Sequence, residues 1–240
     1  MRFLIGVGAA LACLFSLPAL AQTEIVPVPG RTPAPAVTDL ENILLLDLST
    51  GGRVTILLRP DVAPKTVERI KTLTRQHFYD GLKFHRVIEG FMAQTGDPKG
   101  DGTGGSPMPD LKAEFNYLPH VRGAVSAARA ESDDSANSQF FIVFQPTLKL
   151  DKKYTVFGRV IDGMAYVDEV ERGEPPANPS RILHAYIAAD SPPAYVPPAP
   201  EAPAALGPPV SLTDAAAAPK AAPAPKPAPA KPATVGKRRR

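Results

Sequence analysis

The first clear pattern in the chain is a pair of apolar runs made of β-compatible residues. The runs cover residues 42–48 (NILLLDL) and 53–58 (RVTILL), and Ser-Thr-Gly-Gly at 49–52 separates them. Apolar runs joined by a short glycine-containing turn are typical of a β-hairpin. We therefore expect two antiparallel strands at the start of the folded region.

An amphipathic helix is expected next. The segment 61–64 (DVAP) supplies a capping residue and a proline suited to a first helical turn. Val67, Ile70 and Leu73 then recur at helical spacing with basic residues between them. This pattern predicts a helix over residues 64–76.

Beyond residue 81 the pattern returns to short apolar runs. One more short helix is indicated by the spacing of Met164, Val167 and Val170. Many short strands with only two helices favour an antiparallel sheet, either closed into a barrel or folded into a sandwich. Side chains just fill an eight-stranded barrel, so a site for a large substrate would lie on its outer surface. The remaining strands are expected over residues 83–88, 91–95, 124–128, 139–144, 155–160 and 181–188.

The first 21 residues have the pattern of a cleavable secretory signal. A basic start precedes an apolar run over residues 3–17, and Ala-Leu-Ala at 19–21 leads to cleavage before Gln22. The run is shorter than the about 18 apolar residues of a membrane-spanning helix, so we expect a soluble periplasmic protein. Cys13, the one cysteine, lies inside this signal. Lipidation of Cys13 is the alternative, although the residues before it match a lipidation site poorly.

Composition changes sharply at both ends of the folded region. Residues 191–240 contain 14 prolines and 15 alanines, with seven basic and two acidic side chains. Such a segment buries too little apolar surface to offset chain entropy, and we interpret it as a disordered basic tail. A shorter Pro-rich linker covers residues 22–38. The remaining residues, 39–190, have the commonest size of a single domain.

The net positive charge of the chain lies outside its folded region. Residues 22–190 carry 19 basic and 22 acidic side chains, so the overall charge of +3 comes from the tail. The body therefore lacks the charge of a nucleic-acid binder. The basic end, residues 237–240, could contact an anionic envelope surface, although such runs are usually only solvated. A mature chain without cysteine has no disulfide, so its stability must come from a packed core.

Several motifs resemble cofactor or metal sites but lack the required context. Residues 100–105 (GDGTGG) match a dinucleotide fingerprint, yet Pro107 and Pro109 prevent the helix that must follow it. Asp97 and Asp101 lack the twelve-residue pattern of a calcium loop. The four histidines have no metal-like spacing, and no Gly-x-Ser-x-Gly elbow supports serine hydrolase chemistry. We expect no metal, no cofactor and a solvated glycine loop.

Two segments combine a cation, amides and large apolar groups. Residues 84–97 read FHRVIEGFMAQTGD and are followed by GTGG at 102–105. Residues 137–142 read NSQFFI and are followed by YTVFG at 154–158. Together they resemble the signature segments of the cyclophilins, the peptidyl-prolyl cis/trans isomerases, and the resemblance covers nearly all of residues 42–188 in order. It implies a mainly β fold, a closed eight-stranded antiparallel β-barrel capped by two α-helices.

The resemblance also implies roles for individual residues. Arg86 and Gln94 are the expected catalytic residues. Arg86 occupies the place of the catalytic arginine of the family, and Gln94 matches a position along the peptide groove, where its amide would hold the carbonyls beside the proline. Tyr154, at a position where many members carry histidine, forms part of the pocket wall. The proline pocket is matched by Phe91, Met92, Phe141 and Leu150, and the peptide groove by Gly102, Ala128, Arg129, Ala130 and Gln139.

The chemistry of isomerisation is consistent with these residues. Twisting an X-Pro bond breaks amide resonance against a barrier of about 18–20 kcal/mol, and no nucleophile or cofactor is required. The twist localises a lone pair on the prolyl nitrogen, to which a guanidinium can donate only in the twisted state. One hydrogen bond to a charged group contributes about 1.5–3 kcal/mol. A dry pocket and the groove must therefore supply the rest.

Alternation along the strands raises one difficulty. Successive strand residues face opposite sides, so Phe140 can lie in the core while Phe141 lines the groove. The same rule separates Phe91 from Met92, although both are expected in the pocket. We expect a local bend at Gly90 to resolve this.

Two functions remain open at this stage. The first is an isomerase that assists the folding of exported proteins, acting as a monomer on proline-containing polypeptides. The second is an envelope chaperone or adaptor that binds the same segments with little turnover. Lys149 stands where many family members carry tryptophan in the pocket rim. Arg129, where eukaryotic members commonly carry asparagine, adds positive charge to the groove, and the acidic loop over residues 131–136 could offset that charge.

Overall fold

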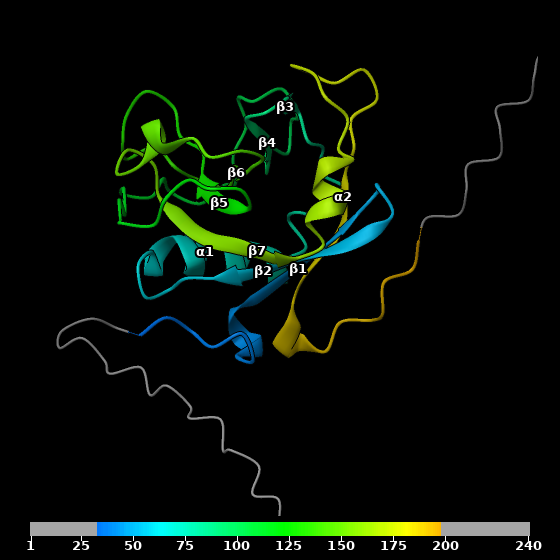
Figure 1. Cartoon of the computed structure of the whole chain (residues 1–240), viewed down its shortest axis with the longest axis horizontal. Helices are drawn as coiled ribbons and strands as arrows, with labels where there is room; N and C mark the ends of the chain where they lie inside the picture. The colour runs from blue at the N-terminus through cyan, green and yellow to red at the C-terminus, as the bar shows by residue number, and fades with distance from the viewer. Residues whose placement is uncertain (1–32, 198–240) are drawn as a thin grey trace, which may run out of the picture. The chain divides into compact units, whose positions relative to one another are not determined.

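The computed structural model describes residues 33–197 (Figure 1). The expected signal segment, the first part of the linker and residues 198–240 of the tail lie outside the described residues. Eight strands, two α-helices and three short 3-10 helices make up the described part. In chain order they are η1 (Leu40–Asn42), β1 (Ile43–Leu48), β2 (Gly52–Leu58), α1 (Pro64–Arg75), β3 (Arg86–Ile88), β4 (Met92–Thr95), β5 (Ala124–Ala127), β6 (Phe140–Val143), η2 (Leu148–Leu150), β7 (Val156–Asp162), α2 (Met164–Asp168), β8 (Ile182–Ile187) and η3 (Ala188–Asp190).

The expected hairpin and both helices are confirmed, but the start of α1 is capped differently from the prediction. Asp61 does not cap the helix, because its carboxylate pairs with the Arg59 guanidinium at 2.7 Å. Instead, the carboxylate of Glu114 accepts hydrogen bonds from the backbone N–H groups of Lys65 and Thr66, at 3.0 and 2.8 Å. A remote side chain thus satisfies donors that the first turn of any helix leaves free.

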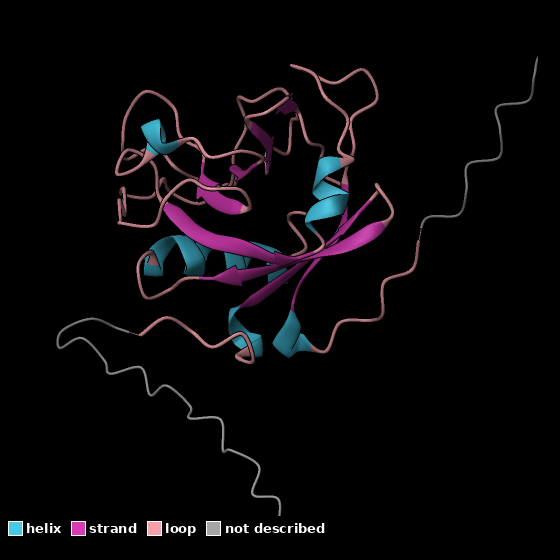
Figure 2. Ribbon diagram, viewed as in Figure 1, coloured by secondary structure: helices cyan, strands magenta, loops and turns pink. Residues whose placement is uncertain are grey.

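The eight strands form a single antiparallel sheet in the order β3-β4-β6-β5-β7-β2-β1-β8. Figure 2 shows these strands in magenta, with the helices beside them in cyan. The sheet curls into a half-barrel but does not close, because the edge strands β3 and β8 do not pair along their length. The two edges meet only near their ends, through an isolated bridge between Lys83 and Arg181 and a hydrogen bond from the Gly81 N–H to the carbonyl of Ile182 at 2.7 Å. The expected closed barrel is therefore only partly confirmed: the strand number and antiparallel pairing hold, while the closure does not.

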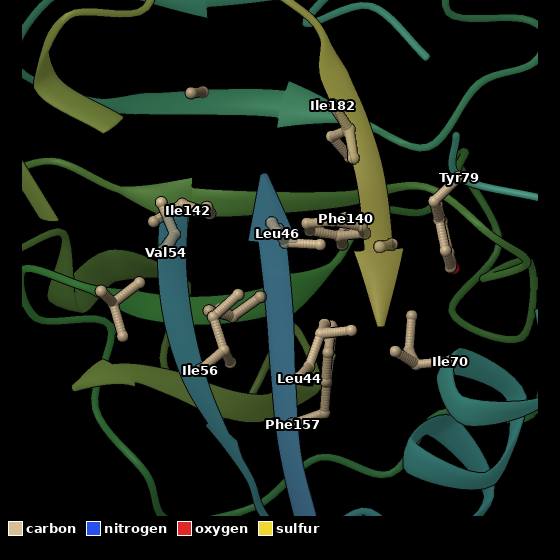
Figure 3. Packing of buried hydrophobic residues seen from close by; sticks show 14 of the residues in the cluster. Leu44, Leu46, Val54, Ile56, Ile70, Tyr79, Phe140, Ile142, Phe157 and Ile182 are labelled. Carbon is tan, nitrogen blue, oxygen red and sulfur yellow. The ribbon is translucent and has the colours of Figure 1, made fainter. Parts of the chain in front are cut away.

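Side chains on the two faces of the sheet form two separate apolar clusters. The main core lies inside the curl, where Leu46, Val54 and Phe140 pack with α1 residues such as Ile70 (Figure 3). In β2, buried and partly exposed residues alternate along the whole strand, as the period of a half-buried strand requires. A second cluster on the outer face contains Met92, Ala124, Phe141, Val143 and Val156.

Residues 191–197 run along the sheet beyond η3. The Arg53 guanidinium donates to the carbonyl of Pro193 at 2.8 Å, and the Tyr195 hydroxyl donates to the carbonyl of Leu48 at 3.3 Å. The first residues of the Pro-rich segment therefore contact the β1–β2 hairpin. Within residues 33–197, no helix has the length and apolarity needed to cross a bilayer.

Candidate active site

Strand register aligns the central residues of the site in one row. Arg86 lies opposite Gln94, Gln94 opposite Phe141, and Phe141 opposite Ser126, across β3, β4, β6 and β5. Directly opposed residues project from the same face of a sheet. The neighbouring row is displaced by one residue on each strand and belongs to the main core: Val87, Ala93, Ile142 and Val125.

A hollow of about 110 Å³, with an apolar base and a basic rim, lies at this row on the outer face. Met92 and Phe141 are 1% and 5% exposed, so they form its base, and Tyr154 meets the Phe141 ring edge-on at 5.9 Å. The hollow is lined by Arg86, Phe91, Met92, Gln94, Ala128, Arg129, Phe141, Leu150 and Tyr154.

A larger, polar cavity of about 380 Å³ shares part of its wall with the hollow. Gln94 Nε2 donates to Gln139 Oε1 at 2.8 Å, and Gln139 Nε2 donates to the carbonyls of Gly102 and Gly104 at 3.0 and 2.7 Å. These amides connect the strands to the glycine loop. The cavity is lined by Gln94, Gly102, Thr103, Gly104, Gly105, Ser106, Asp110, Ala128, Arg129, Ala130, Ser135, Asn137 and Gln139.

The two arginines of the site are each paired with a carboxylate. Arg86 Nε donates to Glu174 Oε2 at 2.6 Å. Arg129 Nη2 lies 3.0 Å from Asp133 Oδ1, and its guanidinium carbon lies 4.6 Å from the centre of the Tyr154 ring. The acidic loop after Arg129 thus offsets one cation of the groove, and the cation–π contact fixes one wall of the hollow.

The glycine loop is organised around the buried carboxylate of Asp97. This carboxylate accepts hydrogen bonds from the backbone N–H groups of Lys99, Asp101 and Gly102, at 2.8, 3.1 and 2.6 Å. Burial by itself raises the pKa of Asp97, but the backbone N–H groups outweigh it and hold the pKa below its ordinary value of 3.8. Asp97, which a calcium loop would use as a ligand, therefore accepts hydrogen bonds from the loop backbone here.

A buried polar network supports the hollow from behind. His120 is fully buried and stacks on Phe141 with 6.1 Å between ring centres. Its Nδ1 lies 2.9 Å from Asp151 Oδ1, and its Nε2 lies 3.1 Å from Ser126 Oγ. The arrangement resembles a hydrolase triad, but Ser126 is 0% exposed and cannot reach a substrate. Burial lowers the pKa of His120, against the opposing effect of Asp151.

A family model described as cyclophilin type peptidyl-prolyl cis-trans isomerase/CLD matches residues 45–187. The chain belongs to this family. Two curated relatives match this chain over most of their own length. A probable peptidyl-prolyl cis-trans isomerase of Brucella suis is 46% identical over 178 residues, covering 68% of this chain and 90% of that protein. Peptidyl-prolyl cis-trans isomerase B of Bacillus subtilis is 43% identical over 129 residues, covering 53% of this chain and 89% of that protein.

Solved cyclophilin structures share the fold. The crystal structure of cyclophilin AquaCyp293 from Hirschia baltica has a TM-score of 0.59 and 27% identity, covering 63% of this chain and 76% of that one. A Cryptosporidium parvum cyclophilin type isomerase, crystallised in the presence of the dipeptide Ala-Pro, has a TM-score of 0.57 and 26% identity. It covers 60% of this chain and 98% of that one.

All the site residues that the cyclophilin resemblance implied lie on one surface of the structure. Each of them lines the hollow, the polar cavity or both. The expected bend is present: Gly90 has a φ of +68°, and the N–H of Phe91 donates to the carbonyl of Ile88 at 3.0 Å. Phe91 therefore lies in a turn before β4, where strand alternation does not apply, and joins Met92 in the hollow. The roles of these residues stay predictions.

Sequence reasoning missed other residues of this cyclophilin surface. Asn137 Oδ1 accepts from the backbone N–H and the hydroxyl of Ser106, at 2.9 and 2.6 Å, and Asn137 Nδ2 donates to Asp110 Oδ1 at 2.9 Å. The signal available for Asn137 was its place in the signature segment, two residues before Gln139. For Glu174 no local signal existed, because it lies 88 residues from Arg86. Among the described residues, no group of His, Cys, Asp and Glu side chains is arranged to hold a metal ion.

Proposed function

We propose that Arg86 and the hollow together catalyse X-Pro isomerisation in this cyclophilin, and that its substrates are exported polypeptides. One observation carries the catalytic part: Arg86, Met92 and Phe141 line the same small hollow. A prolyl ring seated on Met92 and Phe141 would present its nitrogen to a cation at the rim. The relative from Cryptosporidium parvum, crystallised in the presence of Ala-Pro, supports a proline-containing ligand.

In the proposed reaction the hollow and Arg86 act on different parts of one transition state. The planar amide is more polar than the twisted one, so the apolar base of the hollow, once the substrate has displaced the water from it, disfavours the ground state. As the bond twists, Arg86 donates to the lone pair that appears on the prolyl nitrogen. No covalent bond is made or broken, so the residues supply only binding and charge.

The adjoining groove would hold the chain on one side of the rotating bond. Gln94 is half-buried and already linked through Gln139 to the glycine loop, so its amide is fixed rather than free. Fixing the carbonyls beside the proline lets one end of the substrate turn while the other stays bound. The polar cavity beside it would take neighbouring substrate side chains.

The exported location rests on the sequence alone. The basic start, apolar run and Ala-Leu-Ala of the first 21 residues have the pattern of a cleavable signal. A prolyl isomerase in the periplasm would meet newly exported, unfolded chains, in which slow X-Pro isomerisation limits folding. We therefore propose a role in folding of exported proteins.

The experiment compares isomerisation of a proline tetrapeptide by the mature chain and by Arg86→Ala. We expect kcat/KM to fall by about ten- to 150-fold, because one hydrogen bond to a charged group contributes about 1.5–3 kcal/mol. Arg159→Ala is the matched control: Arg159 is exposed on β7 and lines neither the hollow nor the polar cavity.

Unchanged activity in Arg86→Ala would refute the proposed catalytic role. The chaperone alternative makes a different prediction, namely that the wild type binds unfolded chains but isomerises the tetrapeptide no faster than buffer. Measuring both binding and turnover on the same preparation separates the two functions.

A further inference from the structure

The guanidinium of Arg86 is held from one side by a segment far away in the sequence. Its Nε donates to Glu174 Oε2 at 2.6 Å, and the side chains are 43% and 51% exposed. Within residues 33–197, no hydrogen bond or ion pair engages the two Nη atoms of Arg86. The carboxylate therefore takes one edge of the guanidinium and leaves the other edge available to a substrate.

The backbone that carries Glu174 is fixed to the free edge of the sheet. Gly173 and Val87 exchange two backbone hydrogen bonds, at 2.8 and 2.9 Å, one residue away from the Arg86–Glu174 pair. Arg172 adds a second attachment, since it pairs with Glu89 at 2.6 Å and lies 4.4 Å over the Phe144 ring. The backbone of β3 therefore holds the segment that carries Glu174 next to Arg86.

The turn that presents Glu174 requires a glycine. Gly173 has a φ of +149°, and a Cβ placed there would lie 2.5 Å from the Cα of Pro176. No other residue type fits this close approach without moving the backbone. The local geometry is therefore set by backbone packing and does not depend on the ion pair.

We propose that Glu174 is a positioning residue for Arg86: it holds Nε so that the Nη edge faces the hollow. This inference rests on the proposed function of Arg86. An arginine side chain has several rotatable bonds, and fixing it before the substrate arrives removes an ordering cost from the transition state. The Glu174 carboxylate also offsets part of the positive charge of Arg86, and this loss of charge by itself would weaken catalysis. Because both side chains are about half exposed, solvent screens that charge effect, and the orienting effect dominates.

The test measures kcat and KM separately for Glu174→Ala and Glu174→Gln in the mature chain. We expect Glu174→Ala to lower kcat about fivefold with KM nearly unchanged, because the contact to Arg86 acts in the transition state. Glu174→Gln should keep most of the activity, since its amide oxygen can still accept from Nε. Glu171→Ala is the matched control, because it removes one negative charge from the same segment without a contact to Arg86.

A double-mutant comparison separates positioning from a structural effect. In an Arg86→Ala background, Glu174→Ala should cause no further loss. An equal loss in that background, unchanged or higher activity in Glu174→Ala, or an equal loss in Glu174→Gln would each overturn the inference. If Arg86→Ala itself leaves activity unchanged, both this inference and the proposed catalytic role of Arg86 fail. Failure of the Glu174 variants alone leaves that role intact.

Discussion

Replacing Asp97 tests whether one buried carboxylate holds the loop that lines the polar cavity. Asp97 is 1% exposed and accepts three backbone N–H groups of this loop. A hydrogen bond to a charged group contributes about 1.5–3 kcal/mol. The three donor residues are exposed, so their N–H groups can turn to water after the substitution, and we take about 1 kcal/mol for each.

Asp97→Ala should therefore lower the free energy of unfolding by about 3 kcal/mol. With a urea m-value of about 2 kcal/mol per molar, the midpoint of unfolding shifts by about 1.5 M. Asp97→Asn keeps one acceptor oxygen and should lose about half as much. The assay is urea unfolding followed by far-UV circular dichroism. Asp101→Asn is the control, because the Asp101 carboxylate is exposed and accepts only from Thr103.

The pH dependence provides an independent check on Asp97. Its pKa in the folded protein lies below the ordinary value of 3.8, so its stabilising contribution is present above that value and is lost as the pH falls through the folded pKa. The stability gap between wild type and Asp97→Asn should narrow on acidification. A gap that stays constant down to about pH 3, or no gap at neutral pH, would refute this explanation of the loop.

Two further predictions concern His120 and the proposed export. Burial lowers the pKa of His120 below 6.5, so the unfolded chain takes up a proton that the folded chain resists, and stability falls as the pH drops below that value. The free energy of unfolding should therefore decline less steeply between about pH 7 and pH 5 in His120→Gln than in wild type. Some decline should remain in the variant, because burial also lowers the pKa of His85. Equal slopes in the two proteins would contradict this prediction. For export, the mass of the protein recovered from the periplasm should match a chain that begins at Gln22, and recovery of the uncleaved chain in the cytoplasm would contradict the proposal.

Local sequence was sufficient to predict most elements of the fold. The β1–β2 hairpin and both helices follow from apolar periodicity and turn residues, since these patterns act over a few neighbouring residues. The length of β3 was overestimated: residues 83–85 were expected in the strand, but it begins at Arg86. Lys83 instead forms the isolated bridge to Arg181, a pairing that depends on a segment about a hundred residues away.

Closure of the barrel could not be predicted from strand count. Whether eight strands close depends on the pairing of the first and last strands in the sheet, β3 and β8, which have no sequence signal for each other. The edge of β3 is covered instead by the segment around Gly173, which also brings Glu174 to Arg86. The contact between β3 and the Gly173 segment thus determines both how this edge of the sheet is covered and which carboxylate lies next to Arg86.

The amino-acid sequence by itself determined which face each strand residue takes, because side chains alternate with a period of two, so that Phe140 enters the core and Phe141 the outer surface. It also carried the two signature segments and the residue types they need. Only the tertiary structure decided the register that aligns Arg86, Gln94 and Phe141 in one row, the carboxylate that holds Arg86, and the hydrogen bonds that organise the glycine loop. These depend on contacts between segments distant in the chain, whose energies local patterns do not encode.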